Sequence, residues 1–137
     1  MKVIVILDEH NGMRFNQRRQ SRDAAIIHKI QGFMNGEKLY LNAYSAELFK
    51  EADILLSVSE DFLYQTDKGE YCFVENENLD TMKEEIEEFI IFRWHRKYPS
   101  DFVLDILPED CGMTCANMEE FTGNSHEKIT MEVWRKA

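Results

Sequence analysis

The sequence is poor in the residues that disulfide frameworks, metal sites and membrane spans require. Only three of its 137 residues are cysteines and four are histidines. An odd and sparse set of thiols is typical of a reducing compartment. No apolar run approaches the ~20 residues that cross a bilayer. The amino terminus enters a short apolar run at once, without the pattern of a signal or transit peptide. We therefore predict a cytoplasmic protein with no membrane partner.

Basic residues are also scarce. The chain has 16 Lys and Arg against 26 Asp and Glu, a formal net charge of −10. Because phosphate neutralisation requires a basic face, this balance disfavours nucleic acid as a partner. It also makes local groups of basic residues informative. The arginine cluster consists of Arg14, Arg18, Arg19 and Arg22, and a second basic group consists of Arg93, His95, Arg96 and Lys97.

The first 23 residues indicate where a ligand would bind. Residues 2–7 are almost all apolar and β-branched, which predicts a strand covered on both faces. Asn11-Gly12 is a turn signal, and the polar segment 13–23 then leads into a helix. Open α/β sheets bind ligands in the loops at the carboxyl ends of central strands. The loop after the first strand is therefore the predicted site.

Strands and helices alternate along most of the remaining chain. Ser21 is the predicted N-cap of a helix that has Asp23 in its first turn and ends at Asn35-Gly36. Residues 81–84 match a capping box and predict a helix over 81–89. A further helix is expected at 46–51, residues 107–127 are expected to be irregular, and further strands are expected at 38–41, 53–58, 71–74, 89–92, 102–106 and 128–133.

This order of elements predicts an α/β fold with a mixed central sheet flanked by helices. The chain contains no repeat, low-complexity tract or linker, so residues 1–137 are expected to form a single domain. Residues 3–7 and 89–92 are the most continuously apolar runs. We expect these two strands to be adjacent at the centre of the sheet, with helices on both of its faces.

Several of these landmarks resemble dihydrofolate reductase, in the same order along most of the chain. Residues 11–13 are similar to the start of that family's mobile loop, and Asp23 falls where the family keeps its catalytic carboxylate. Residues 39–47 resemble the turn that receives the 2′-phosphate side of NADPH. Residues 72–96 can be laid without gaps over the strand, Gly-Gly turn, helix and strand that follow. The resemblance implies a shortened fold, because residues 59–70 are too few for the usual extra strand and helix.

The departures from this family fall on its functional positions. Glu75-Asn76 stands where the family has Gly-Gly against the pyrophosphate, and Ala43 replaces the arginine of the cofactor turn. A side chain blocks close approach of the backbone, and a carboxylate repels phosphate. Phe92 replaces the threonine that helps to position the pterin. We therefore predict that the chain lacks the usual NADPH site and holds no cofactor.

The chain is also similar to small Firmicute proteins that are sometimes labelled ribonuclease Z. That label implies a metallo-β-lactamase fold, whose paired zinc site needs a His-x-His-x-Asp-His cluster. The four histidines of this chain are scattered, with no His-x-His, and cannot hold two metals in that way. The label is therefore disfavoured.

Asp23 is the candidate catalytic residue, a proton donor if burial raises its pKa. The alternative is an acid in the first helical turn that faces Arg19 or Arg22. The candidate ligand-binding residues are Asn11, Gly12, Met13, Arg14, Phe15, Arg18, Arg19, Arg22, Arg93 and Arg96. Guanidinium groups suit phosphate and carboxylate, whereas the alternative is a solvated loop paired with surplus acids. We expect these arginines to converge beside Asp23, with Asp101 as the other nearby carboxylate.

Two further patterns have simpler structural explanations, which we favour. Residues 93–98 interleave basic and aromatic side chains, as single-strand binding surfaces do. A strand with Phe92 and Trp94 facing inward explains the same pattern. Cys111, Cys115 and the distant His126 are a weak zinc signal, and ordinary thiols are expected instead. No metal site is predicted.

The sequence thus predicts a repurposed dihydrofolate reductase-like domain. It would bind a small anionic or nucleotide-like ligand at the loop after the first strand. The alternative is a divergent pterin or nucleotide oxidoreductase that uses Asp23. RNA processing comes third, implied by the ribonuclease Z label alone. The oligomeric state is left open.

Overall fold

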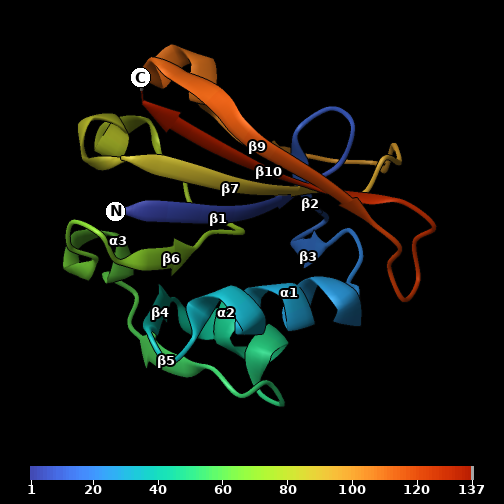
Figure 1. The fold of residues 1–137 in the computed structure, drawn as a ribbon, viewed down its shortest axis with the longest axis horizontal. Helices are drawn as coiled ribbons and strands as arrows, with labels where there is room; N and C mark the ends of the chain where they lie inside the picture. Colours follow the sequence, from blue (N-terminus) through green and yellow to red (C-terminus); the bar gives the residue numbers. More distant parts are fainter. Residues whose placement is uncertain (137) are drawn as a thin grey trace.

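A seven-stranded mixed sheet forms the centre of the computed structural model, which describes residues 1–136 (Figure 1). The strand order is β5-β4-β6-β1-β7-β10-β9. The strands span Lys2–Leu7 (β1), Lys38–Leu41 (β4), Leu55–Val58 (β5), Tyr71–Phe73 (β6), Glu88–Arg93 (β7), Met113–Phe121 (β9) and Ile129–Lys136 (β10). The first five in spatial order are parallel, and β10 pairs antiparallel with both of its neighbours, β7 and β9. The expected mixed α/β fold is confirmed.

Strand β1 lies in the middle of the sheet, beside β7 as expected. The two strands pair in parallel along their whole length, from Lys2 opposite Glu88 to Leu7 opposite Arg93. Val3 and Val5 face one core cluster, and Ile4 faces the other. Because both faces of these strands are covered, their apolar residues run continuously rather than alternating with polar ones.

One face of the sheet is covered by helix α1 (Ala24–Met34), whose Ile26, Ile30 and Met34 are buried against it. The helix ends at Asn35 in the left-handed conformation, as the Asn-Gly pair predicts. The predicted N-cap was wrong. Asp23, not Ser21, caps the helix, and its carboxylate accepts a hydrogen bond from the Ala25 amide. Asp23 therefore precedes the first turn instead of lying within it.

The other face of the sheet is covered by short segments: α3 (Phe62–Gln65) and the 3-10 helices η2 (Asp80–Glu85) and η3 (Pro108–Cys111). The predicted helix over 81–89 was wrong. Pairing with β1 extends β7 back to Glu88, which leaves room only for η2. The amides of Leu79 and Asp80 donate to the Asp105 carboxylate, which organises this turn in place of the expected capping box.

The prediction that residues 107–127 are irregular was also wrong. Within this segment β9 forms a nine-residue edge strand paired only with β10. From Thr114 to Glu120 every side chain is exposed, on both faces of the sheet. A strand without a buried face has no reason to alternate apolar and polar residues, so the period that identifies a strand is missing.

A second, three-stranded sheet lies at the carboxyl end of β1, in the order β3-β2-β8. Its strands span Gly12–Phe15 (β2), Arg18–Arg19 (β3) and Phe102–Val103 (β8). The predicted loop 13–23 is thus partly a hairpin, whose tip residues Asn16 and Gln17 both have positive φ. The predicted strand at 102–106 is shorter and belongs to this sheet.

After β4, the chain forms the short helix α2 (Ala43–Ala46) and the 3-10 helix η1 (Glu47–Phe49). This helical segment begins three residues before the predicted 46–51. Asn42 caps it, because its side-chain oxygen accepts from the Ser45 amide.

None of the helices in the described part of the chain is long and apolar enough to cross a membrane.

Candidate functional site

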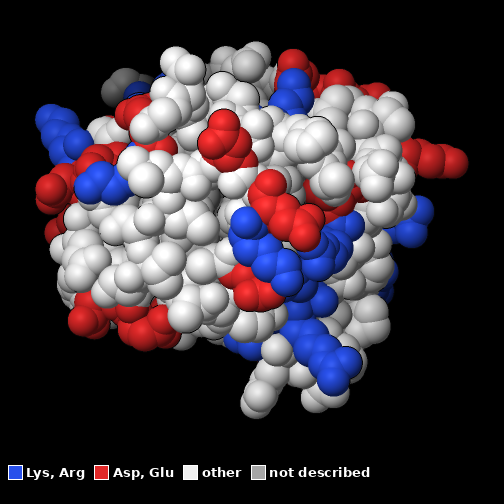
Figure 2. All heavy atoms as spheres, turned by 90° about the horizontal axis from the view of Figure 1, so that it is seen from below, with Lys and Arg blue, Asp and Glu red and all other residues white. Residues whose placement is uncertain are grey.

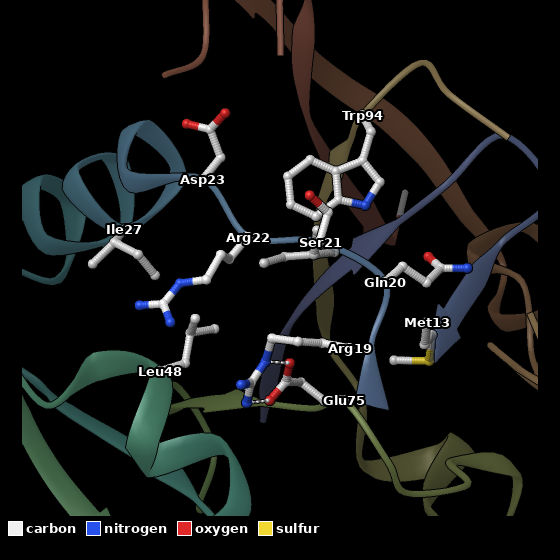
Figure 3. A pocket seen from close by; sticks show the side chains of 11 residues that line it. Met13, Arg19, Gln20, Ser21, Arg22, Asp23, Ile27, Leu48, Glu75 and Trp94 are labelled. Carbon is white, nitrogen blue, oxygen red and sulfur yellow. Dashed lines mark hydrogen bonds and ion pairs between the residues drawn. The ribbon is translucent and has the colours of Figure 1, made fainter. Parts of the chain in front are cut away.

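An interior hollow lies where the loop after β1 meets α1, η1 and the end of β6 (Figure 3). Its lining includes Met13, Gln20, Ile27, Leu48 and Trp94, together with Arg19, Arg22 and Asp23. The hollow holds only about 10 Å³. Sites for drug-sized ligands are typically ~300–1,000 Å³, so this space takes no more than a water-sized group.

Arg19 does not face a free site, because it is paired with Glu75. Its Nε and Nη2 donate to the two carboxylate oxygens of Glu75 at 2.7 and 2.8 Å, a two-point contact visible in Figure 3. The Ser45 hydroxyl donates to the same carboxylate at 2.8 Å. The hydrogen bond to Glu75 raises the pKa of Arg19. The expectation that only Asp23 and Asp101 balance the arginine cluster is therefore wrong.

Tyr44 gathers two members of the arginine cluster. The guanidinium carbons of Arg14 and Arg19 lie 4.8 and 4.7 Å from the centre of its ring. The pKa of the exposed Glu47 carboxylate is lowered mainly by its hydrogen bond to Lys50. The positive charges of Arg19 and Arg22 lower it further. Figure 2 shows Lys and Arg side chains gathered in one group on the underside of the molecule, with acidic side chains at its edge.

Arg22 lines both the interior hollow and a larger space beside it, which we call the outer cleft. The outer cleft lies between α1 and η1 and holds about 230 Å³. In Figure 3 the Arg22 guanidinium is directed between Ile27 and Leu48, which also line the cleft. Among residues 1–136, Arg22 makes no hydrogen bond or ion pair through its side chain.

The remaining candidate arginines do not converge on this place as expected. Arg93 donates to Glu132 at 3.0 Å and to the side chain of Asn11 at 2.8 Å, at the end of β7. Arg96 lies in the exposed turn after it, and Arg18 is exposed on β3. The structure thus brings Arg14, Arg19 and Arg22 together and leaves the other three outside the group.

The four other candidates lie in β2 or just before it. Asn11 has φ of 63° and accepts the bond from Arg93. Gly12 is needed because a Cβ there would lie 2.7 Å from side-chain atoms of both Asp8 and Gln20. Met13 is buried in the lining of the hollow, and Phe15 is 47% exposed on the hairpin.

Asp23 is buried and fully hydrogen-bonded. Its carboxylate accepts from the amides of Ala25, Asn124 and Ser125 and contacts Nδ1 of His126 at 2.9 Å. Burial raises its pKa, but these hydrogen bonds outweigh burial and lower the pKa to about 2. The expectation of a raised pKa is therefore wrong. Figure 3 shows the carboxylate directed away from Arg19 and Arg22, so the alternative partner was wrong too.

Sequence reasoning missed the surroundings of His126. Its ring is buried, stacks on Trp94 at a centroid distance of 4.3 Å, and places Nε2 2.9 Å from the Tyr98 hydroxyl. Because ionised Asp23 only accepts, Nδ1 of His126 is the donor in this contact. No sequence spacing links these residues, which lie up to 103 positions apart.

Within residues 1–136 no group of three or more His, Cys, Asp or Glu side chains is arranged to hold a metal ion. Cys111 ends η3 and Cys115 lies in β9, and both are free thiols. His126 is occupied by Asp23 and Tyr98. The part of the chain that the structure describes therefore offers these three residues no shared metal.

Comparison with known proteins supports the fold. No protein-family model matches the chain, and no curated protein does. Among solved structures, the chain is similar to dihydrofolate reductase from Enterococcus faecalis in complex with NADP(H) and RAB-propyl. The TM-score is 0.66, over 98% of this chain and 94% of that one. At 10% identity, the likeness confirms the dihydrofolate reductase-like fold and nothing finer.

The residues of this chain do not fit the dinucleotide that this fold family implies. Where glycines would let a pyrophosphate approach the backbone, the Glu75 carboxylate is buried and bonded to Arg19 and Ser45. The neighbouring Asn76 accepts a hydrogen bond from Asn42. These bonds hold both side chains in place, and one of the two is an anion.

Proposed function

We propose that this chain is a binding domain that holds a small anionic ligand in the outer cleft, with Arg22 contacting the negative charge. The observation that supports this is the contrast among arginines in the described chain. Arg19 and Arg93 are each paired with a buried glutamate, whereas Arg22 lines a cleft and its side chain makes no ion pair within residues 1–136. A guanidinium in this position can bind phosphate or carboxylate through two parallel hydrogen bonds.

The dimensions and lining of the outer cleft limit the ligand. Its volume of about 230 Å³ lies below the ~300–1,000 Å³ of typical ligand sites. Ile27 and Leu48 provide an apolar wall, and His28 and Gln31 offer polar groups. Asp23 and Glu51 also line the cleft, and their carboxylates repel any further negative group on the ligand. The ligand class is therefore a small molecule with one anionic group and a short apolar part.

An oxidoreductase that uses Asp23 finds no support in this geometry. A proton donor must hold a proton near neutral pH, whereas the pKa of Asp23 is lowered to about 2. The interior hollow of about 10 Å³ also has no room for a pterin-sized ring system. We therefore assign Asp23 a structural role and place the ligand in the outer cleft.

Thermal unfolding in sodium phosphate and in sodium chloride, at equal ionic strength, tests this function. We expect phosphate to raise the Tm of the parent saturably, because a ligand that binds only the native state stabilises it. Arg22→Ala should abolish this phosphate-specific rise. Arg18→Ala is the matched control, since it removes the same charge from an exposed site outside the cleft, and it should respond as the parent does.

Phosphate also stabilises proteins by exclusion from their surface, and all three proteins share that effect. The informative quantity is therefore the difference between the three proteins in how far phosphate raises the Tm above its value in chloride. If Arg22→Ala keeps the full phosphate response of the parent, the outer cleft is not the anion site.

A further inference from the structure

We infer that Arg19 and Ser45 form a second anion-binding site, which the chain's own Glu75 carboxylate occupies, and that phosphate is the ligand class it takes once Glu75 is removed. This site is separate from the outer cleft and depends on a different arginine. Its basis is the convergence of three donors on one carboxylate. Arg19 supplies Nε and Nη2 and Ser45 supplies its hydroxyl, all within 2.8 Å of Glu75 oxygens.

The donors of this site are held in place independently of Glu75. Nη2 of Arg19 also donates to the Tyr44 carbonyl at 3.3 Å, and the guanidinium lies over the Tyr44 ring. Ser45 is fixed by its amide, which donates to the side chain of Asn42 at 3.0 Å. A fork of two N–H groups beside a hydroxyl matches the oxygens of a phosphate as well as those of a carboxylate.

The charge around Tyr44 favours an anion at this place. Arg14 and Arg19 lie over the same ring, and of these two Arg19 is in direct contact with the Glu75 carboxylate. Nε of Arg14 is buried without a hydrogen-bond partner among the described residues. Arg14 and Arg19 are opposite each other in the β2–β3 pair. Neutralising Glu75 therefore leaves two like charges on neighbouring residues, which destabilise each other unless an anion balances them.

Glu75 therefore acts as an internal competitor for phosphate. Its side chain is 8% exposed and that of Arg19 is 20% exposed, so the pair is only weakly screened by solvent. An external anion must displace a carboxylate that is covalently part of the same domain. The parent is expected to leave this site closed, in agreement with the poor fit of a dinucleotide there.

The test compares Arg22→Ala with Arg22→Ala/Glu75→Gln, because the first change removes the contribution of the outer cleft. Glutamine keeps the size of Glu75 and removes its charge. We expect the apparent dissociation constant for inorganic phosphate, measured by calorimetry and by Tm, to fall about tenfold or more in the double variant. An unchanged phosphate affinity would overturn the inference.

Glu132→Gln in the same background is the matched control. Glu132 is also paired with an arginine, Arg93, at 3.0 Å, and its side chain is 9% exposed. The Glu132→Gln variant should gain no phosphate affinity. A gain equal to that of Glu75→Gln would show that the effect comes from net charge alone, and it would overturn the inference. Adding Arg19→Gln to the Glu75→Gln variant should abolish the gain, and a gain that survives would likewise contradict the site.

If Arg22→Ala/Glu75→Gln does not fold in chloride, its refolding yield in phosphate becomes the measurement. Selective recovery in phosphate, absent when Arg19→Gln is added, supports the inference. Equal recovery with and without Arg19, or no recovery at all, contradicts it. The outcome at Glu75 is independent of the proposed function, because Arg22 is absent from every protein in this comparison.

Discussion

The Asp23 carboxylate and the His126 imidazole lie 2.9 Å apart, both buried, and join the start of α1 to the loop that precedes β10. The other nitrogen of His126 reaches the Tyr98 hydroxyl in the loop after β7. Three segments far apart in the sequence are therefore held by one line of hydrogen bonds. Trp94, stacked on the imidazole, fixes its orientation.

Asp23→Asn is expected to destabilise the protein by about 2–4 kcal/mol at pH 7. An asparagine amide places donors against the amides of Ala25, Asn124 and Ser125 and cannot replace the carboxylate. Urea unfolding measures the change. Asp67→Asn is the control, because Asp67 is exposed and its side chain makes no hydrogen bond among the described residues, and it should shift the free energy by less than about 0.5 kcal/mol.

The same pair of proteins carries a pH signature. The pKa of Asp23 is lowered in the folded state from 3.8 to about 2. A lowered pKa contributes stability that is fully present above the unfolded value and is lost as the pH falls through the folded value. The difference between parent and Asp23→Asn should therefore stay constant down to about pH 5 and narrow between about pH 4 and 2. If the difference in unfolding free energy between the two proteins does not change with pH across this range, the Asp23 carboxylate is not held ionised by its partners.

Gly12→Ala is expected to destabilise the protein by about 1–3 kcal/mol through overpacking. The added Cβ would lie 2.7 Å from Oδ2 of Asp8 and 2.8 Å from Cβ of Ser100. Gly32→Ala is the matched control inside α1, where nothing lies within 4 Å of the new Cβ. It should stabilise by about 0.5–1 kcal/mol, because alanine is the better helix former. Chemical unfolding of both variants measures the two opposite signs, and a stabilising Gly12→Ala would contradict the described packing.

The parts of the fold that the sequence predicts are those whose signal is local. Continuous apolar runs identify β1 and β7, because burial on both faces leaves no polar positions. Helix α1 follows from its apolar face and the Asn35-Gly36 stop. Strand β9 escaped prediction because its side chains are solvent-exposed and pairing with β10 alone specifies it.

The place of the arginine cluster in the fold was predictable, and the partners of its side chains were not. Segment 13–23 does lie at the carboxyl end of β1 and does bring three arginines together. The partner of Arg19 lies 56 residues away, and no local pattern distinguishes Glu75 from the other acids of an acidic chain. The same holds for Asp23 and His126, where the long-range hydrogen bonds reverse the expected direction of the pKa shift.

We expect no saturable NADPH binding to the parent and no NADPH-dependent reduction of dihydrofolate. The buried Glu75 carboxylate opposes a pyrophosphate both by volume and by charge. Ala43 in place of an arginine removes a charged hydrogen bond worth ~1.5–3 kcal/mol. Each 1.4 kcal/mol is about tenfold in affinity. These losses together should therefore weaken a micromolar NADPH site until its binding is no longer measurable.

Isothermal calorimetry with NADPH, and absorbance at the NADPH band with dihydrofolate added, measure the two parts. The Enterococcus faecalis dihydrofolate reductase, which was solved with NADP(H), is the positive control for binding. A micromolar dissociation constant for the parent would mean that Glu75 leaves Arg19 when the dinucleotide arrives. Such a result would reopen the oxidoreductase hypothesis, and Glu75→Gln should then bind NADPH more tightly than the parent.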